Sequence, residues 1–427
     1  MTRHQLILRG GTVVNEDSTE VADVAISDGV VVEVGAALEG DRVIDATGLH
    51  VSAGFVDLHT HLREPGKEEA ETIETGSRAA ALGGYTAVVA MPNTDPTADN
   101  VETVRFVAAQ GVRAGLCEVM PSGAITIGRL GTDLVPYALL AAEGVTLCTD
   151  DGTGVQDALV MQRALMAASR AGIVLAQHCE VARLTAGAVM NHGSCCSHMG
   201  VPGWPAEAEE EMIRRDLSLV RITGAPMHFL HLSTAGSVEL LREAKREGLP
   251  VTCEVTPHHI ALTEDLLTGF DPIFKVNPPL RTREDIAALH EGLRDGTIDA
   301  LATDHAPHAE HTKEMPLDAA PPGMLGLETA LAVLLTVVDL DPRRVVEVMS
   351  WNPARIARLD ARHGRDIAPG APANIAVWDA SARWTVSRHA LASKSRNSPF
   401  HGMELTGKVR HTVFNGELVV HEGKALK

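Results

Sequence analysis

The sequence predicts an α/β protein, namely a TIM (β/α)8 barrel with a smaller β-sandwich domain formed by both termini. Strand-length apolar runs alternate with helix-length amphipathic segments through the middle of the chain, whereas both ends carry short alternating runs separated by turn residues. Several of the middle runs end in His, Asp or Asn. Because barrel enzymes build their active sites at the carboxyl ends of the strands, this placement predicts a shared site.

The two ends of the chain have the pattern of β-structure. Asp28-Gly29 lies between two alternating runs and favours a two-residue hairpin turn. We therefore assign residues 1–50 plus 365–427 to one composite β-sandwich domain and residues 51–364 to the barrel. The β-rich runs are 6–51, 373–378, 407–413 and 415–420.

The middle of the chain predicts eight strands, each followed by a longer segment, over roughly 310 residues, a length that suits one α/β barrel. The expected strands are 51–58, 85–91, 112–120, 144–149, 173–177, 226–231, 250–256 and 299–303. Helix candidates between them are 68–81, 101–110, 155–171, 206–219, 237–247 and 326–338.

Composition excludes several classes of function. The net charge of −19 and the absence of any long run of Lys and Arg argue against binding nucleic acid or an anionic membrane. The longest apolar stretch, 330–338, is far shorter than the roughly 20 residues of a membrane span. No signal-peptide pattern opens the chain, and the 6 cysteines are scattered, so we expect a cytoplasmic protein.

The strand ends collect residues that bind metal ions. His59 and His61 are two apart, and such residues share one face of a strand. Each residue alone could be a satisfied polar group, but together they predict two metal ions bridged by a carboxylate. Imidazole with carboxylate favours Zn²⁺, and a pair of ions activates water for hydrolysis of an amide-like carbonyl. The full set is His59, His61, Asp151 (or its neighbour Asp150), His178, His231 and Asp304.

Eight motifs together resemble the dihydroorotases, and more narrowly the bacterial type I enzymes of the amidohydrolase superfamily. The resemblance covers nearly the whole chain. The motifs are DLHTHLREPG from residue 57, MPNT at 91–94, TDDG at 149–152, QHCE at 177–180, HLST at 231–234, TPHH at 256–259, VNPPLR at 276–281 and ATDHAPH at 302–308.

The resemblance implies a reaction and a ligand set. The reaction is the reversible cyclisation of N-carbamoyl-L-aspartate to (S)-dihydroorotate, the third step of pyrimidine biosynthesis. His59, His61 and Asp304 would hold one Zn²⁺, His178 and His231 a second, and Asp151 both, although the isolated protein could contain one ion. Asp304 would carry the proton. Hydantoinases and allantoinases place a carboxylated lysine on the fourth strand, where this chain has Asp150-Asp151.

Substrate recognition requires cationic or amide donors, since carbamoyl-aspartate carries two carboxylates and dihydroorotate one. Arg63 follows His61 closely, and a guanidinium binds a carboxylate through two parallel hydrogen bonds. The resemblance assigns further substrate contacts to His61, Asn93, Asn277 and His308, and to the backbone near Pro322 and Gly323. The unusually long segment 307–324 contains three of these residues and is expected to close over the site.

Two alternatives remain open at this stage. One is another cyclic amide hydrolase, of the dihydropyrimidinase or allantoinase type, against which Arg63 and the missing lysine both argue. The other is a non-catalytic partner of aspartate carbamoyltransferase, although such chains have lost ligands that this one keeps. We expect a homo-oligomer, and association with aspartate carbamoyltransferase is compatible with an active enzyme.

Overall fold

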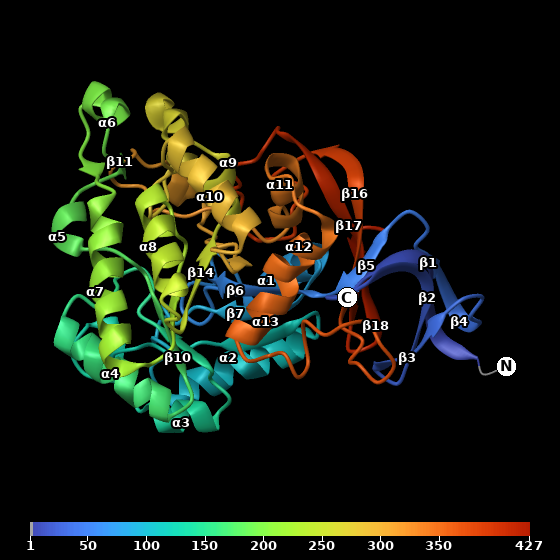
Figure 1. The fold of residues 1–427 in the computed structure, drawn as a ribbon. Helices are drawn as coiled ribbons and strands as arrows, with labels where there is room; N and C mark the ends of the chain where they lie inside the picture. The colour runs from blue at the N-terminus through green and yellow to red at the C-terminus, as the bar shows by residue number, and fades with distance from the viewer. Residues whose placement is uncertain (1–2) are drawn as a thin grey trace.

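The computed structural model describes residues 3–427 and separates a sheet built from both termini from a larger α/β region. Figure 1 shows the blue N-terminal strands beside the red C-terminal strands at one end of the molecule, with the helices of the middle of the chain at the other. The polypeptide therefore leaves the terminal sheet, forms the α/β region and returns.

The terminal sheet has nine strands and a hydrophobic core of its own. Its path is β19-β18-β17-β16-β5-β1-β2-β3, and β4 pairs with β1 beside β5. The strands are β1 (His4–Val14), β2 (Thr19–Ser27), β3 (Val30–Gly35), β4 (Gly40–Asp45), β5 (His50–Ala53), β16 (Ile375–Thr385), β17 (Glu404–Phe414), β18 (Glu417–His421) and β19 (Lys424–Ala425).

The predicted hairpin at Asp28-Gly29 is confirmed. Ser27 pairs with Val30, and both turn residues have a positive φ, 51° and 81°, as the favoured two-residue turn requires. The rest of the N-terminal region is not a simple meander, because β4 and β5 both run parallel to β1.

The α/β region contains eight parallel strands in two sheets, of three and five strands. Two isolated parallel bridges join the edges of the two sheets. One links Thr60 with His305, just after β15, and the other links Gly123, just after β8, with Cys148. The strands are β6 (Phe55–Thr60), β7 (Tyr85–Ala90), β8 (Glu118–Pro121), β9 (Leu147–Thr149), β10 (Val174–Gln177), β13 (Met227–Phe229), β14 (Val251–Val255) and β15 (Ala300–Leu301).

The two predicted strands that differ most from the observed ones are 51–58 and 112–120. The expected strand 51–58 is divided at Gly54, which leaves β5 in the terminal sheet and β6 in the α/β region. A Cβ atom on Gly54 would lie 2.3 Å from Cγ2 of Thr86, so only glycine fits at this crossing. The expected strand 112–120 begins instead at Glu118, because helix α2 continues to Ala114.

Helices cover the parallel strands and share one large core with them. Several begin at a side-chain cap, such as Asn100 before α2 and Asp157 before α4, which satisfies a free backbone N–H. The longer helices are α1 (Ile73–Leu82), α2 (Val101–Ala114), α4 (Ala158–Arg170), α7 (Glu207–Thr223), α8 (Ala235–Arg246), α10 (Arg283–Asp295) and α11 (Ala330–Val337).

Short elements complete the fold. They are α3 (Tyr137–Ala142), α5 (Ala182–Thr185), α6 (Ser194–Met199), α9 (Pro257–Ala261), α12 (Pro342–Val346), α13 (Asn352–Ile356), the two-residue strands β11 (Met190–Asn191) and β12 (Gly203–Trp204), and single turns at Ile127–Arg129, Glu264–Gly269, Pro272–Phe274, Glu310–Glu314 and Glu347–Trp351. Among the helices of residues 3–427, none has both the length and the apolar character needed to cross a bilayer.

Candidate metal centre and substrate pocket

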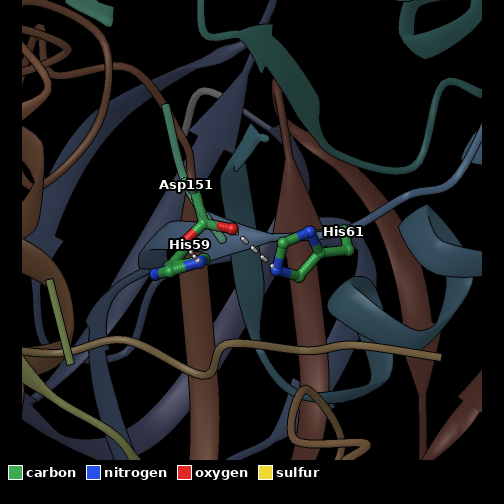
Figure 2. Close-up of side chains that lie close together, drawn as sticks. All are labelled: His59, His61 and Asp151. Carbon is green, nitrogen blue, oxygen red and sulfur yellow. Dashed lines mark ion pairs between the residues drawn. The ribbon is translucent and has the colours of Figure 1, made fainter. Parts of the chain in front are cut away.

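The carboxyl ends of the parallel strands bring the predicted ligands together. His59 is the second-last residue of β6, His61 follows the end of that strand, and Asp151 follows β9. Figure 2 shows the Asp151 carboxylate facing both imidazoles. Nε2 of His59 lies 3.4 Å from Oδ1 of Asp151, and Nε2 of His61 lies 3.5 Å from Oδ2. The pair that the H-x-H spacing predicted therefore converges on one carboxylate.

Asp151 also faces the histidines of two further strands. Its Oδ1 lies 3.4 Å from Nδ1 of His178 and 3.7 Å from Nε2 of His231. Two groups of donors result, His59-His61-Asp151 and Asp151-His178-His231, and within each group the ligand atoms lie within 4.8 Å of one another. Asp151 belongs to both groups, so this arrangement could hold two ions with a shared carboxylate.

Asp304 lies at the same centre. Its Oδ1 lies 3.0 Å from Nε2 of His61 and 3.4 Å from Nε2 of His59. Burial opposes ionisation of Asp304, but the charge of His59 and the hydrogen bond to His61 outweigh it and lower the pKa of Asp304. Asp304 is therefore ionised, as a metal ligand must be.

The donors fit a metal ion. Nε2 of His59 is buried and has no hydrogen-bond partner among the described residues, although an unpartnered buried ring nitrogen is costly. Its other nitrogen, Nδ1, donates to Glu254 at 2.9 Å, so Nε2 is the ring nitrogen that remains available to a metal ion. Such an imidazole, oriented from behind by a carboxylate, is typical of metal ligands.

His61 and His178 are also oriented by a side-chain oxygen. Nδ1 of His61 donates to Oδ1 of Asn93 at 2.9 Å, and Nε2 of His178 donates to Oε2 of Glu180 at 2.9 Å. Sequence reasoning did not identify Glu180 or Glu254. The usable signal for Glu254 was a carboxylate inside the apolar strand VTCEV, where a buried charge requires a partner.

Asp150 has a different environment from Asp151. Its Oδ1 accepts hydrogen bonds from the backbone N–H groups of Ile125 and Thr126, at 2.8 and 3.1 Å. The side chain thus holds the loop that follows β8. Spacing alone left the two aspartates equivalent, whereas the structure directs only Asp151 toward the histidines.

A pocket of about 160 Å³ opens over the cluster. Arg63 lies in its wall with a positive φ of 65°, and its Nε donates to the carbonyl of Pro307 at 3.0 Å. Burial lowers the pKa of Arg63 to about 10, so the guanidinium stays charged at neutral pH. All the substrate contacts expected from the sequence line this pocket: His61, Arg63, Asn93, Asn277, His308, Pro322 and Gly323.

The backbone polar atoms at 322 and 323 already have partners. Nε2 of His308 donates to the carbonyl of Pro322 at 2.8 Å, and the N–H of Gly323 donates to the carbonyl of Lys275 at 2.9 Å. Oxygen Oδ1 of Asn397, from the C-terminal part of the chain, accepts from the N–H of His308, and its Nδ2 donates to the carbonyl of Gly323. In this conformation the segment contributes shape to the pocket, not free hydrogen-bonding groups.

Solved structures with this fold define the class of protein. The chain matches the L-hydantoinase (dihydropyrimidinase) from Arthrobacter aurescens with a TM-score of 0.88 and 27% sequence identity, covering 99% of this chain and 98% of that one. A D-hydantoinase structure matches with a TM-score of 0.81 at 24% identity, a likeness of fold alone. The fold and the His/Asp cluster together make this chain a cyclic amidohydrolase.

Sequence comparison defines the family within that class. The family model described as dihydro-orotase-like matches residues 48–237. Curated dihydroorotases from Streptomyces coelicolor and Mycobacterium tuberculosis are each 48% identical, covering 98% and 95% of this chain and 99% and 96% of their own lengths. The chain belongs to the dihydroorotase family.

Proposed function

We propose that this chain catalyses the reversible cyclisation of N-carbamoyl-L-aspartate to (S)-dihydroorotate and water. The observation that carries the proposal is one pocket that contains both the His/Asp cluster and a buried, charged Arg63. A neutral ring, such as that of dihydrouracil or allantoin, offers this guanidinium no carboxylate. The sequence around Asp151 contains no lysine, which further separates the site from the carboxylated-lysine sites of hydantoinases.

The proposed architecture is a closed (β/α)8 barrel beside a β-sandwich. The sequence places these in residues 51–364 and in residues 1–50 plus 365–427, and the pairing of β5 in the terminal sheet moves the first boundary to Gly54. The bridges Thr60–His305 and Gly123–Cys148 support closure, since they link the outer strands of the two parallel sheets. A separate core over the nine-stranded sheet supports the second domain.

The proposed cofactor is a pair of Zn²⁺ ions. His59, His61 and Asp304 would hold the first, His178 and His231 the second, and Asp151 both. The two donor groups support the histidine and Asp151 assignments, and the proximity of Asp304 to His59 and His61 supports its place at the first ion. When bound, such ions polarise a carbonyl and lower the pKa of water.

The substrate carboxylate would bind Arg63 and Asn93, with Asn277 and His308 closing the other side of the pocket. Pro322 and Gly323 would contact the substrate through packing. Because the guanidinium is held by Pro307, little side-chain entropy remains to be lost on binding.

Asp304 would move the proton. In cyclisation the substrate carboxylate that reacts first takes up one proton from solution. Asp304 then accepts the proton from the carbamoyl nitrogen as the nitrogen–carbon bond forms, and returns it to the departing hydroxyl, which leaves as water. In ring opening it accepts a proton from water and returns it to the ring nitrogen as the amide bond breaks. His61, whose Nε2 lies 3.0 Å from Asp304, orients this carboxylate.

The deciding experiment is an ultraviolet assay of the zinc-loaded protein with dihydroorotate and carbamoyl-aspartate, run beside dihydrouracil and allantoin. Reversible turnover of the first pair alone supports the proposal. Turnover of a neutral ring moves the chain to the hydantoinase type, and no turnover with any substrate favours the scaffold alternative. Size-exclusion chromatography alone and with aspartate carbamoyltransferase tests the proposed homo-oligomer and the proposed partner, which rest on the family resemblance.

A further inference from the structure

Two buried lysines lie behind one wall of the pocket, outside every group discussed so far. Lys275 precedes the pocket residues Val276 and Asn277, and Lys313 lies in the single turn Glu310–Glu314. Lys275 is only 6% exposed and Lys313 only 7%, which is unusual for lysine. Neither is expected from the sequence motifs.

Each ammonium group holds backbone carbonyls of the long segment after β15. Lys275 Nζ donates to the carbonyls of Leu317, Asp318 and Ala320 at 2.7, 3.1 and 2.8 Å. Lys313 Nζ donates to the carbonyls of Pro321 and Pro272 at 2.8 and 2.9 Å, and to that of Lys275 at 3.4 Å. The carbonyl of Lys275 also accepts the N–H of Gly323 at 2.9 Å.

These bonds connect residues 272–275 to residues 317–323. The first stretch leads into Asn277, and the second contains Pro322 and Gly323, which line the same pocket as Asn277. The two lysines therefore fix the position of residues 317–323 relative to residues 272–275, and so the position of Pro322 and Gly323 relative to Asn277. Positioning of this kind matters because small displacements of a binding group are costly in catalysis.

The charge of the two lysines is not neutralised by these partners. Their hydrogen-bond acceptors are carbonyls, and the carboxylates that act on them electrostatically, Asp271 and Asp318, are exposed to solvent. Burial and the neighbouring Lys275 lower the pKa of Lys313 to about 7. Buried charge without a counter-ion is unfavourable, and an anion in the pocket would compensate it.

We propose that Lys275 and Lys313 are positioning residues that hold the 317–323 wall in place and favour the more highly charged substrate. The inference rests on the proposed function, in which carbamoyl-aspartate carries two carboxylates and dihydroorotate one. The two lysines would therefore stabilise bound carbamoyl-aspartate more than bound dihydroorotate.

The test compares wild type with Lys313→Met, Lys313→Arg and Lys275→Met, all zinc-loaded. Hydrogen–deuterium exchange is followed in peptides covering 309–324, and KM and kcat are measured in both directions. We expect faster exchange in both Met variants, a KM for carbamoyl-aspartate raised about tenfold, a smaller rise for dihydroorotate, and kcat changed less than KM. Lys313→Arg keeps the charge and should keep most of the preference for carbamoyl-aspartate.

The matched control is Lys245→Met, because the Lys245 ammonium pairs with Asp299 directly before β15 and neither residue lines the pocket. It should alter neither exchange at 309–324 nor KM. Unchanged exchange in the Lys313→Met and Lys275→Met variants would overturn the positioning role. An equal KM rise for both substrates, or a Lys313→Arg variant as defective as Lys313→Met, would overturn the charge role. Failure of wild type to turn over dihydroorotate would refute the proposed function, whereas the exchange comparison would still decide the positioning role.

Discussion

Oε1 of Glu254 lies 2.9 Å from Nδ1 of His59, and both side chains are fully buried. The second oxygen of the same carboxylate accepts a hydrogen bond from Nε2 of His228 at 3.0 Å, and His228 in turn contacts Thr252. Burial opposes ionisation, yet the hydrogen bonds from His228 and His59 lower the pKa of Glu254 to about 2. A carboxylate on β14 thus determines which nitrogen of His59 faces the centre.

Glu254→Gln should weaken metal binding. The amide cannot accept from both histidines as a carboxylate does, so His59 loses its fixed orientation, and loss of such a partner typically lowers metal affinity about 10- to 100-fold. Zinc affinity measured by competition with a chelator checks this, with Glu239→Gln on the surface of α8 as the control. Wild-type affinity in Glu254→Gln would contradict the orienting role.

Asp304→Asn should abolish turnover and spare substrate binding. The amide keeps the size of the side chain but cannot accept the proton, and loss of a general base typically costs about 10²- to 10⁴-fold in kcat. Steady-state kinetics and zinc content of the purified variant provide the measurement. Appreciable kcat in the variant would exclude Asp304 as the proton carrier.

Asp151→Ala should lower the zinc content of both donor groups, since Asp151 belongs to each of them. Asp150→Ala provides the matched comparison. It should retain zinc but lower the free energy of unfolding by about 1–3 kcal/mol, because it removes the oxygen that accepts two buried backbone N–H groups. Metal analysis and denaturant unfolding distinguish the two; full zinc content in Asp151→Ala would refute the bridge.

Arg63→Lys should raise KM for dihydroorotate by at least about tenfold, because a lysine cannot form two parallel hydrogen bonds with a carboxylate. The Nε–H bond to Pro307 that fixes the side chain is lost as well. Initial-rate kinetics, with Arg105→Lys in an exposed ion pair as the control, test the assignment. If KM stayed at the wild-type value, the carboxylate would have to bind elsewhere.

Glu118→Gln should lower stability in a pH-dependent way. Hydrogen bonds from His363 and Arg362 overcome the effect of burial and lower the pKa of Glu118 to about 2. A carboxylate with a lowered pKa stabilises the fold above its unfolded value near 4.5, and that contribution is lost as the pH falls toward 2. After allowance for solvent exposure, we expect a loss of about 1–2 kcal/mol at pH 7.

Thermal unfolding of wild type and Glu118→Gln between pH 7 and pH 3 provides the measurement. The difference in Tm should be largest at neutral pH and should shrink below pH 4.5. Glu143→Gln, in an exposed pair with Arg105, should change Tm little at any pH. If the Tm difference between wild type and Glu118→Gln grew on acidification, the predicted direction of the pH dependence would be wrong.

Local pattern accounts for much of what the sequence predicted correctly. The H-x-H pair had to share a face because strand side chains alternate, and Asp28-Gly29 had to turn because both residues tolerate a positive φ. The start of α2 at Val101 follows from the cap Asn100. These features depend on neighbours a few residues away.

Other features depend on contacts between distant segments. Gly54 divides a continuous apolar run because Thr86 packs against it, and β4 joins β1 in parallel although the two are close in sequence. Periodicity states which residues share a face but not which strand lies beside it, so these pairings were not predictable from the pattern.

The sequence by itself determined the ligand types, their places at the strand ends and the family, because residue chemistry and short-range geometry are encoded locally. Only the tertiary structure decided between Asp150 and Asp151, placed Glu254 behind His59 and set Lys275 and Lys313 behind the pocket wall. Each of these depends on which groups remain to satisfy a buried charge once separate segments have packed together, and that competition is settled by the whole fold.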